Sequence, residues 1–205
     1  MIPFPEKQYS VIYADPPWSY QQQGGPKGKR GTANAHYGTM STNDICELPV
    51  KNLCGVGSAL FMWATFPQIA DAIRVMEAWG FRYKTAAFVW VKKNAKSGSN
   101  FWGMGAYTRA NAEVCLLGVT PDFRAKDAIK CHGVHQIIEA PIEAHSKKPD
   151  EARRRIVELM GDVPRIELFA RCRAEGWDAW GNELSEMERN VEQAAAAALA
   201  EGATE

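Results

Sequence analysis

The sequence predicts an α/β fold with a mostly parallel sheet, because short apolar runs that suit buried strands alternate along the chain with segments of helical spacing. The chain has 205 residues, of which 46% are hydrophobic and 23% charged, enough for one domain with a sizeable core. No run reaches the roughly 18 apolar residues of a membrane span, so we expect no membrane association.

The first strand is expected within Ser10–Trp18, where Val11 and Ile12 are β-branched. Pro16 and Pro17 have no backbone N–H and cannot continue a strand, so Asp15 should end it, with Trp18 just beyond. Ligands of open α/β sheets bind at that edge. The alternative is an ordinary strand that ends in a proline turn.

The remaining elements follow from spacing and end signals. Ser41 or Thr42 is expected to cap the first of three helices. Gly55–Gly57 is no glycine-rich cofactor loop, because it precedes a strand instead of following one. Arg171 to Glu183 is expected to be a loop. The helices are predicted at 41–48, 68–79 and 149–160, and the further strands at 59–63, 83–91, 112–119, 134–139 and 165–170.

Two long irregular segments, about 19–40 and 92–110, combine basic residues with glycines and aromatic rings. In the second, Phe101, Trp102 and Tyr107 stand among lysines and an arginine, a composition that suits phosphate contact and base stacking. A solvated flexible loop is the alternative. We expect residues 1–184 to form one domain, and the alanine-rich residues 185–205 to form a helix-prone tail.

The formal net charge is zero, so any nucleic-acid binding must come from local patches. Five cysteines, odd in number and widely spaced, indicate reduced thiols. With no signal-like stretch near Met1, a cytoplasmic protein is expected. Cys131, His132 and His135 look like metal ligands, but no matching ligand pair accompanies them, and we expect no metal.

The strand edge at Asp15 suits an amine substrate. A carboxylate accepts hydrogen bonds from an amino group, the carbonyls of Asp15 and Pro16 add acceptors, and the Trp18 indole offers a flat face for a ring. An exocyclic amine such as N6 of adenine fits this set. Methyl transfer from a sulfonium donor is the matching reaction, because it depends on in-line placement more than on a metal.

Asp15-Pro16-Pro17-Trp18 resembles the catalytic tetrapeptide of the MT-A70 family of S-adenosylmethionine-dependent adenine-N6 methyltransferases. Further segments resemble the family in the same order, and the resemblance runs from about Val11 to Glu183. These segments are His36-Tyr37-Gly38-Thr39-Met40, Ala87-Phe88-Val89-Trp90-Val91-Lys92, Ser146-Lys147-Lys148-Pro149-Asp150-Glu151, Ile166-Glu167-Leu168-Phe169-Ala170-Arg171 and Trp180-Gly181-Asn182-Glu183.

The resemblance implies a Rossmann-like methyltransferase with permuted motif order, and S-adenosylmethionine as cofactor. Lys148 would pair with the methionine carboxylate of the cofactor. Asn182 and Glu183 would bind the ribose, although the family often has glutamine at the second position. Arg171 would lie near the cofactor adenine, or else form a solvated ion pair. Asp15 and Phe169 complete the expected cofactor contacts.

On the substrate side, the resemblance and the composition of the loops suggest contacts to the target base and its strand. Trp18, Tyr37 and Trp63 have core packing as their alternative. Glu113 lies in a segment that the family uses near the target, or it only pairs with Arg109. The expected catalytic residues are Asp15, Pro16, Pro17 and Trp18, and the expected substrate contacts are Trp18, Tyr20, Tyr37, Trp63, Lys92, Arg109 and Asn111.

The resulting expectation is methyl transfer to N6 of adenine in DNA, because the chain is compact and shows no added zinc or RNA-binding module. RNA is the first alternative. A non-catalytic binding member is the second, and the intact Asp15–Trp18 motif argues against it. Methylation of a protein amide is the third, and related enzymes perform it with asparagine at the position of Asp15. Oligomeric state is left open.

Overall fold

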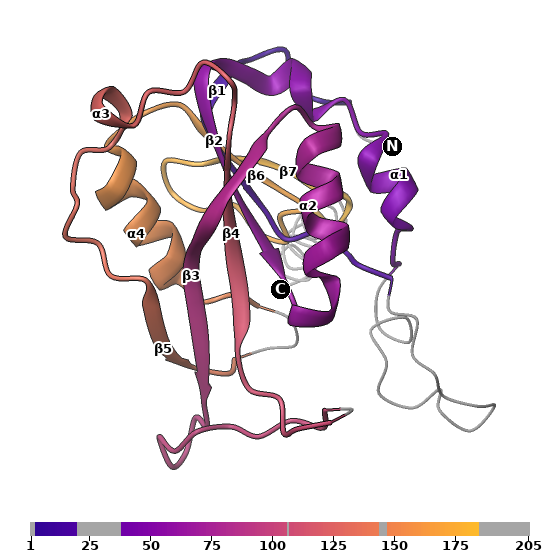
Figure 1. Cartoon of the computed structure of the whole chain (residues 1–205), viewed down its shortest axis with the longest axis vertical. Helices are drawn as coiled ribbons and strands as arrows, with labels where there is room; N and C mark the ends of the chain where they lie inside the picture. The colour runs from indigo at the N-terminus through magenta and orange to yellow at the C-terminus, as the bar shows by residue number, and fades with distance from the viewer. Residues whose placement is uncertain (1–2, 20–37, 106, 144–146, 185–205) are drawn as a thin grey trace, which may run out of the picture.

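The computed structural model describes residues 3–19, 38–105, 107–143 and 147–184. Its centre is a seven-stranded sheet with the order β5-β3-β4-β2-β1-β6-β7 (Figure 1). The strands are β1 Tyr9–Ala14, β2 Cys54–Ala64, β3 Arg82–Lys93, β4 Glu113–Val119, β5 Ile137–Pro141, β6 Arg165–Leu168 and β7 Asp178–Trp180. The expected tail, 185–205, lies outside the described residues.

The sheet is mostly parallel, as the sequence predicts. Strand β1 lies parallel to β2 on one side and to β6 on the other, and the pairs β3–β5 and β6–β7 are also parallel. Only β4 runs against its neighbours β2 and β3. The carboxyl ends of β1, β2, β3 and β6 therefore meet the amino end of β4 at one edge of the sheet.

Helices cover both faces of this sheet. On one face lie α1 Thr42–Cys46 and α2 Ile69–Ala78, and on the other lie α3 Ala125–Ala128 and α4 Asp150–Met160 (Figure 1). Two short 3₁₀ turns, η2 Val50–Leu53 and η3 Phe66–Gln68, flank β2. The Ser41 hydroxyl caps α1 by accepting from the Asp44 backbone N–H, which confirms one of the two expected caps.

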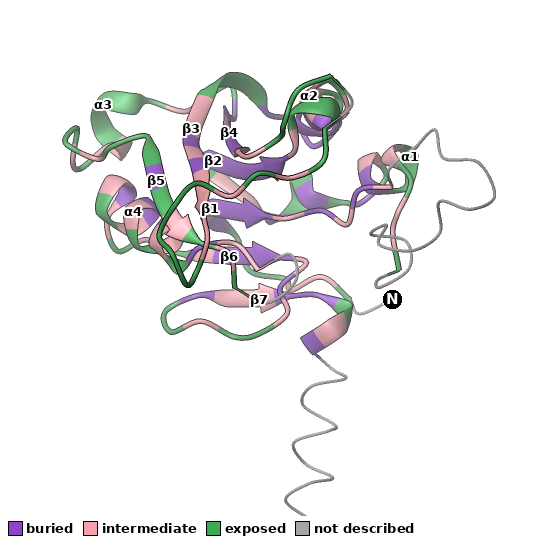
Figure 2. Ribbon diagram, turned by 90° about the horizontal axis from the view of Figure 1, so that it is seen from below, coloured by how far each residue is buried: buried purple, intermediate pink, exposed green. Residues whose placement is uncertain are grey.

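The alternation of side chains along β1 divides the core in two. Ile12 and Ala14 belong to the apolar cluster beneath α1 and α2, whereas Val11 and Tyr13 belong to the cluster beneath α4. The central strands are accordingly buried on both faces (Figure 2). Such two-sided burial explains why these segments are near-continuous apolar runs.

The structure corrects the expected elements at three places. Residues 178–180, expected within a loop, form β7 beside β6; a three-residue strand carries too little pattern to be found from sequence. Strand β5 begins at Ile137 instead of residue 134, because Val134 is apolar through packing against the core, not through strand pairing. Strand β2 begins at Cys54 instead of residue 59, so Gly55–Gly57 lies inside the strand and not before it; the glycines do not follow a strand, so they still form no cofactor loop.

Candidate active site

Asp15 follows the last residue of β1 and keeps 24% of its side chain exposed. The two prolines beyond it turn the chain sharply. The Trp18 N–H donates to the Pro16 carbonyl at 2.8 Å, and the Met40 N–H donates to the Pro17 carbonyl at 2.9 Å. Each proline carbonyl therefore already accepts one hydrogen bond and keeps one lone pair for a ligand.

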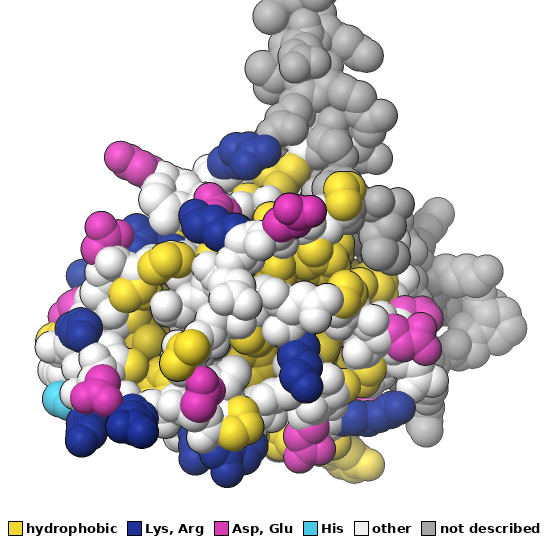
Figure 3. All heavy atoms as spheres, turned by 90° about the horizontal axis from the view of Figure 1, so that it is seen from above, with side chains coloured by type: hydrophobic (Ala, Val, Ile, Leu, Met, Phe, Trp, Pro, Cys, Tyr) yellow, Lys and Arg dark blue, Asp and Glu magenta, His cyan; other side chains and the backbone are white. Residues whose placement is uncertain are grey.

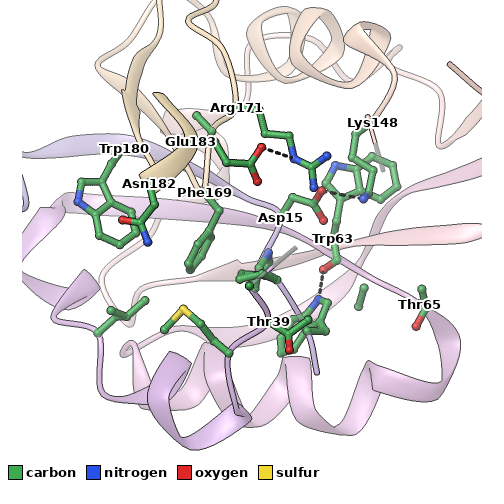
Figure 4. Close-up of a pocket in the computed structure, with 18 of the residues that line it drawn as sticks. Asp15, Thr39, Trp63, Thr65, Lys148, Phe169, Arg171, Trp180, Asn182 and Glu183 are labelled. Atoms are coloured by element: carbon green, nitrogen blue, oxygen red, sulfur yellow. Dashed lines mark hydrogen bonds and ion pairs between the residues drawn. The ribbon is translucent and has the colours of Figure 1, made fainter. Parts of the chain in front are cut away.

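A chain of charged groups leads from Asp15 across the edge of the sheet. The Lys148 ammonium lies 2.7 Å from the Asp15 carboxylate and 3.4 Å from Glu113. Glu113, at the amino end of β4, also accepts from Lys92 of β3 at 2.6 Å. Figure 4 shows the Asp15 and Lys148 side chains directed at each other beside Trp63. Two carboxylates and two ammonium groups thus alternate in this chain.

Burial and pairing set the protonation of these groups. Burial raises the pKa of Asp15 above its ordinary value, by more than the adjacent Lys148 lowers it. Burial also disfavours charge on Glu113, but Lys148 and Lys92 outweigh it and hold the pKa of Glu113 below its usual range. For Lys148, burial alone would lower the pKa, and the two carboxylates reverse the direction. The lysine is therefore a firmly charged group.

The opposite wall comes from the ends of β6 and β7. Phe169 directly follows β6 in the left-handed region, with φ 60°, a conformation that bulky residues rarely adopt outside functional sites. The Ala170 N–H donates to the Trp180 carbonyl at 3.0 Å. A Cβ on Gly181 would lie 2.3 Å from the Ala170 carbonyl oxygen, so only glycine allows the two segments to approach this closely.

This close approach places the Glu183 side chain beside Arg171, and the Asn182 side chain beside Trp180 (Figure 4). The Arg171 Nε lies 3.5 Å from the Glu183 carboxylate. The Phe169 ring meets Trp180 edge-on, with 5.6 Å between centroids. Polar groups and a ring edge therefore face the cleft from this wall.

The two walls enclose one cleft, which contains about 1080 Å³ of empty space when its open mouth is included. It brings together the expected catalytic segment and every expected cofactor residue. The lining residues are Asp15, Pro16, Pro17, Trp18, Gly38, Thr39, Met40, Leu48, Trp63, Ala64, Thr65, Glu113, Lys148, Phe169, Ala170, Arg171, Trp180, Asn182 and Glu183.

The donors and acceptors of this cleft fit S-adenosylmethionine. The Lys148 ammonium suits a carboxylate, the Asn182 amide and Glu183 carboxylate suit a ribose diol, and the Phe169 ring suits an apolar face of the ligand. The cofactor carboxylate would share Lys148 with Asp15 and Glu113.

Trp18 and Trp63 line the cleft but are nearly or fully buried, at 5% and 0% exposure. The Trp18 indole N–H donates to the Trp63 carbonyl at 3.0 Å, and the Trp63 indole N–H donates to the Tyr13 hydroxyl at 2.6 Å. Both rings therefore belong to the core as well as to the wall. Stacking of Trp18 on a base stays a prediction.

The other expected substrate residues lie away from the cleft or outside the described residues. Lys92 is held by Glu113, and Asn111 is used within its own loop, where its amide oxygen accepts from the Lys92 N–H at 2.9 Å. Arg109 donates to the Met104 sulfur at 3.2 Å instead of pairing with Glu113. Tyr20 and Tyr37 are not among the described residues.

Glu113 and Thr65 line the cleft but are not among the expected site residues: the sequence places Glu113 only near the target or as a partner of Arg109, and gives Thr65 no role. Glu113 links Lys92 to Lys148. The sequence feature that could have singled it out is a charged residue at the start of an apolar run. Thr65 directly follows β2, and its buried hydroxyl has no hydrogen-bond partner in the part of the chain that the structure describes. The strand-end rule that selected Asp15 would also have selected Thr65.

Fold and site together define a Rossmann-like methyltransferase, and the comparisons with known proteins agree. The family model of MT-A70 matches residues 9–183. The chain therefore belongs to the MT-A70 family, and it is a methyltransferase that uses S-adenosylmethionine.

Among its relatives, the Type II methyltransferase M.MunI of Mycoplasma sp is 34% identical over 197 residues, which cover 88% of this chain and 79% of that enzyme. An N(6)-adenosine-methyltransferase MT-A70-like protein of Arabidopsis thaliana is 27% identical, over 86% of this chain and 24% of its own length. The human N(6)-adenosine-methyltransferase catalytic subunit METTL3 is 26% identical, over 86% of this chain and 28% of that protein. The chain thus spans about a quarter of these two plant and human relatives.

Proposed function

We propose that this protein transfers a methyl group from S-adenosylmethionine to N6 of adenine in DNA. The observation that carries the proposal is the partly open Asp15 carboxylate in one cleft with Lys148, Asn182 and Glu183. A hydrogen-bond acceptor for an amine thus lies beside groups that suit the two ends of the cofactor.

On the cofactor side, Lys148 binds the carboxylate, Asn182 and Glu183 bind the ribose hydroxyls, and Arg171 and Phe169 border the adenine. When bound, the cofactor supplies an electrophilic methyl group on a sulfonium. Lys148 contacts Asp15 in the same cleft, so this lysine would bring the two halves of the site together. Correct mutual placement is the main contribution that such a site makes to methyl transfer.

On the substrate side, the Asp15 carboxylate and the Pro16 carbonyl would each accept one hydrogen bond from the N6 amine. Holding both N–H groups would direct the nitrogen lone pair at the methyl group. As the new N–C bond formed, the sulfonium C–S bond would break, the demethylated thioether would leave, and the nitrogen would give up one proton to Asp15 or to water. Trp18 borders the base on the wall of the cleft. In a duplex, the target adenine must leave the stack to reach Asp15, at a cost of about a few kcal/mol.

DNA is favoured as the substrate because the bacterial relative M.MunI is named as a Type II methyltransferase, a class that modifies DNA. RNA is the second candidate, since the plant and human relatives are named as N(6)-adenosine-methyltransferases. Among the described residues, no helix is long and apolar enough to cross a membrane. All five cysteines are free thiols, which supports the proposed cytoplasmic location.

Incubation with methyl-labelled S-adenosylmethionine and separate pools of unmethylated DNA, RNA and protein tests the proposal. Nucleoside analysis should find label as N6-methyladenine in the DNA pool. Label in the RNA pool alone would replace DNA by the second candidate. Label in no pool, from a folded protein that binds the cofactor, would contradict the proposed activity.

A further inference from the structure

Three large apolar side chains stand exposed on the segment between β3 and β4, residues 94–112. Trp102 is 59% exposed, Met104 87% and Tyr107 101%. Most exposed apolar residues elsewhere in the described chain are single, whereas these three follow one another within six positions. Grouped apolar exposure of this kind marks an interaction surface.

Within the described residues of the segment, backbone hydrogen bonds hold both neighbours of Trp102: the Phe101 N–H donates to the Lys92 carbonyl, and the Gly103 N–H to the Ala110 carbonyl at 2.7 Å. The Asn111 amide donates to the carbonyls of Lys92 and Phe101, so it ties the end of the segment to its middle and to the end of β3. A Cβ on Gly105 would lie 1.9 Å from the Thr108 carbonyl oxygen, so only glycine at 105 allows this approach to Thr108.

The base of this segment is continuous with the active site. Lys92 precedes it and Glu113 follows it, and these two residues form an ion pair whose carboxylate also contacts Lys148. Lys148 in turn contacts Asp15. Figure 1 shows the segment projecting beyond the edge of the sheet at which β3 ends and β4 begins. The exposed rings therefore lie on the same side of the molecule as the cleft.

The charge of the segment suits a polyanion. Residues 94–112 contain Lys96 and Arg109 and no acidic residue. Arg109 and Trp102 line one shallow hollow of the surface, so a cation and an indole border the same site. A cation beside a ring can contact a phosphate while the ring meets a base.

We propose that Trp102 inserts into the DNA duplex and fills the gap left by the adenine that enters the cleft. This inference rests on the proposed function. Arg109 and Lys96 hold the adjoining phosphates, and Met104 and Tyr107 cover the flanking base pairs. Apolar side chains that enter an opened base step offset the cost of unstacking. Trp102 is needed only where a stacked base has to be displaced, and it takes no part in methyl transfer itself.

The test compares initial rates on one unmethylated plasmid DNA, offered either native or heat-denatured. Trp102→Ala should lose about tenfold or more on native DNA, the contribution of one stacked base, and stay within about twofold of wild type on denatured DNA. Trp102→Phe should recover most of the loss. Tyr83→Ala, which removes an exposed ring at the opposite end of β3, should match wild type on both forms.

Equal losses by Trp102→Ala on both DNA forms, or no loss on either, would overturn the insertion while leaving the methyltransferase assignment intact. A wild type that sediments as a dimer and a Trp102→Ala variant that sediments as a monomer would also overturn the insertion, because the ring would then bind a second copy of the chain. A wild-type enzyme that methylates denatured DNA but not native DNA would also overturn the insertion. A wild-type enzyme that methylates no DNA removes the proposed function itself.

Discussion

At the scale of single residues, the site depends on how Lys148 is shared. Its side chain is 9% exposed, and its ammonium contacts two carboxylates, Asp15 and Glu113. An ion pair this far from water is costly to form and costlier to break on one side only, because the remaining charge stays buried. Lys148 thus has two effects that a substitution can separate, one on stability and one on cofactor affinity.

Lys148→Met should lower the free energy of unfolding by about 2–4 kcal/mol at neutral pH, because it leaves two carboxylates without this cation. It should weaken S-adenosylmethionine binding about 10- to 100-fold, the value of one charge-assisted hydrogen bond. Urea unfolding and calorimetry measure the two effects. Lys147→Met, which removes an exposed neighbour paired with Glu143 and Asp150, is the matched control. Unchanged cofactor affinity in Lys148→Met would exclude it from the site.

The stability effect of Lys148→Met should depend on pH. In the wild type, the pKa of Glu113 is lowered from 4.5 by Lys148 and Lys92 against the opposing effect of burial, so its pairing stabilises the fold above that pH. This contribution is lost as pH falls through the lowered pKa. The gap in stability between Lys148→Met and wild type should therefore be largest near neutrality and shrink below about pH 4.5. A gap that is independent of pH would show that packing, not charge, is lost.

The pKa of Asp15 is shifted in the opposite direction to that of Glu113. Burial raises the pKa of Asp15 above 3.8, so the folded protein binds that proton more tightly than the unfolded chain does. As pH falls, Asp15 is protonated at a higher pH than an ordinary aspartate, and the protonated carboxyl accepts the amine hydrogen bond less well. The single-turnover rate of methyl transfer should therefore fall on the acid side with an apparent pKa above 3.8. An apparent pKa at or below 3.8 for the loss of rate, in a protein that circular dichroism shows to be folded, would contradict the role of Asp15 as the acceptor.

At the scale of elements, the cleft depends on two strand ends that differ in how well the sequence predicts them. The end of β1 could be predicted, because two prolines after β-branched residues leave a strand no way to continue. The end of β7 could not, because its three residues pair only with β6. Its position is nevertheless enforced by Gly181, whose missing side chain lets residues 180–181 approach Ala170.

Gly181→Ala should therefore damage the cofactor wall. Its Cβ would meet the Ala170 backbone at 2.3 Å and 2.8 Å, so one of the two segments must move. We expect a loss of about 1–3 kcal/mol in unfolding free energy and weaker cofactor binding. Thermal melts and calorimetry measure both. Gly55→Ala, whose new methyl meets the Tyr9 backbone at an ordinary 3.4 Å, should change neither. A fully stable Gly181→Ala that binds cofactor normally would refute the close approach.

The sequence predicts which residues line the site better than it predicts what they contact. Lys148, Arg171, Asn182 and Glu183 were placed by resemblance, and all line the cleft. The contacts are harder to predict, because Glu113 and Lys148 are distant in the chain. They meet only because β4 is antiparallel and begins at the edge where the parallel strands end. The burial of Trp18 was also beyond the sequence, since a ring after two prolines can turn inward or outward.

At the scale of the whole molecule, a net charge of zero makes DNA binding a matter of local charge. At the end of the molecule away from the cleft, basic and acidic side chains are interspersed (Figure 3). Residues 94–112, beside the cleft, are basic and without acids. We infer that the side of the molecule with the cleft is the one that binds the phosphate backbone.

Salt should therefore weaken DNA methylation, with a logarithmic slope of kcat/KM against salt of about −2 or steeper, since each phosphate contact contributes about −0.9. The double variant Lys96→Ala/Arg109→Ala should make the slope shallower by about 2. The double variant Lys84→Ala/Lys126→Ala, with two exposed lysines outside residues 94–112, should leave the slope unchanged. Equal slopes for all three proteins would show that this segment does not bind phosphates.

The central claim is that Asp15 holds the adenine amine for methyl transfer, and the Asp15→Ala variant tests it most directly. The measurement is the single-turnover rate of N6-methyladenine formation in DNA, in a variant shown by its melting curve to be folded. We expect a loss of about 10²–10⁴-fold, the usual contribution of a positioned polar group in the transition state. A folded Asp15→Ala variant that methylates DNA at the wild-type rate would contradict the account.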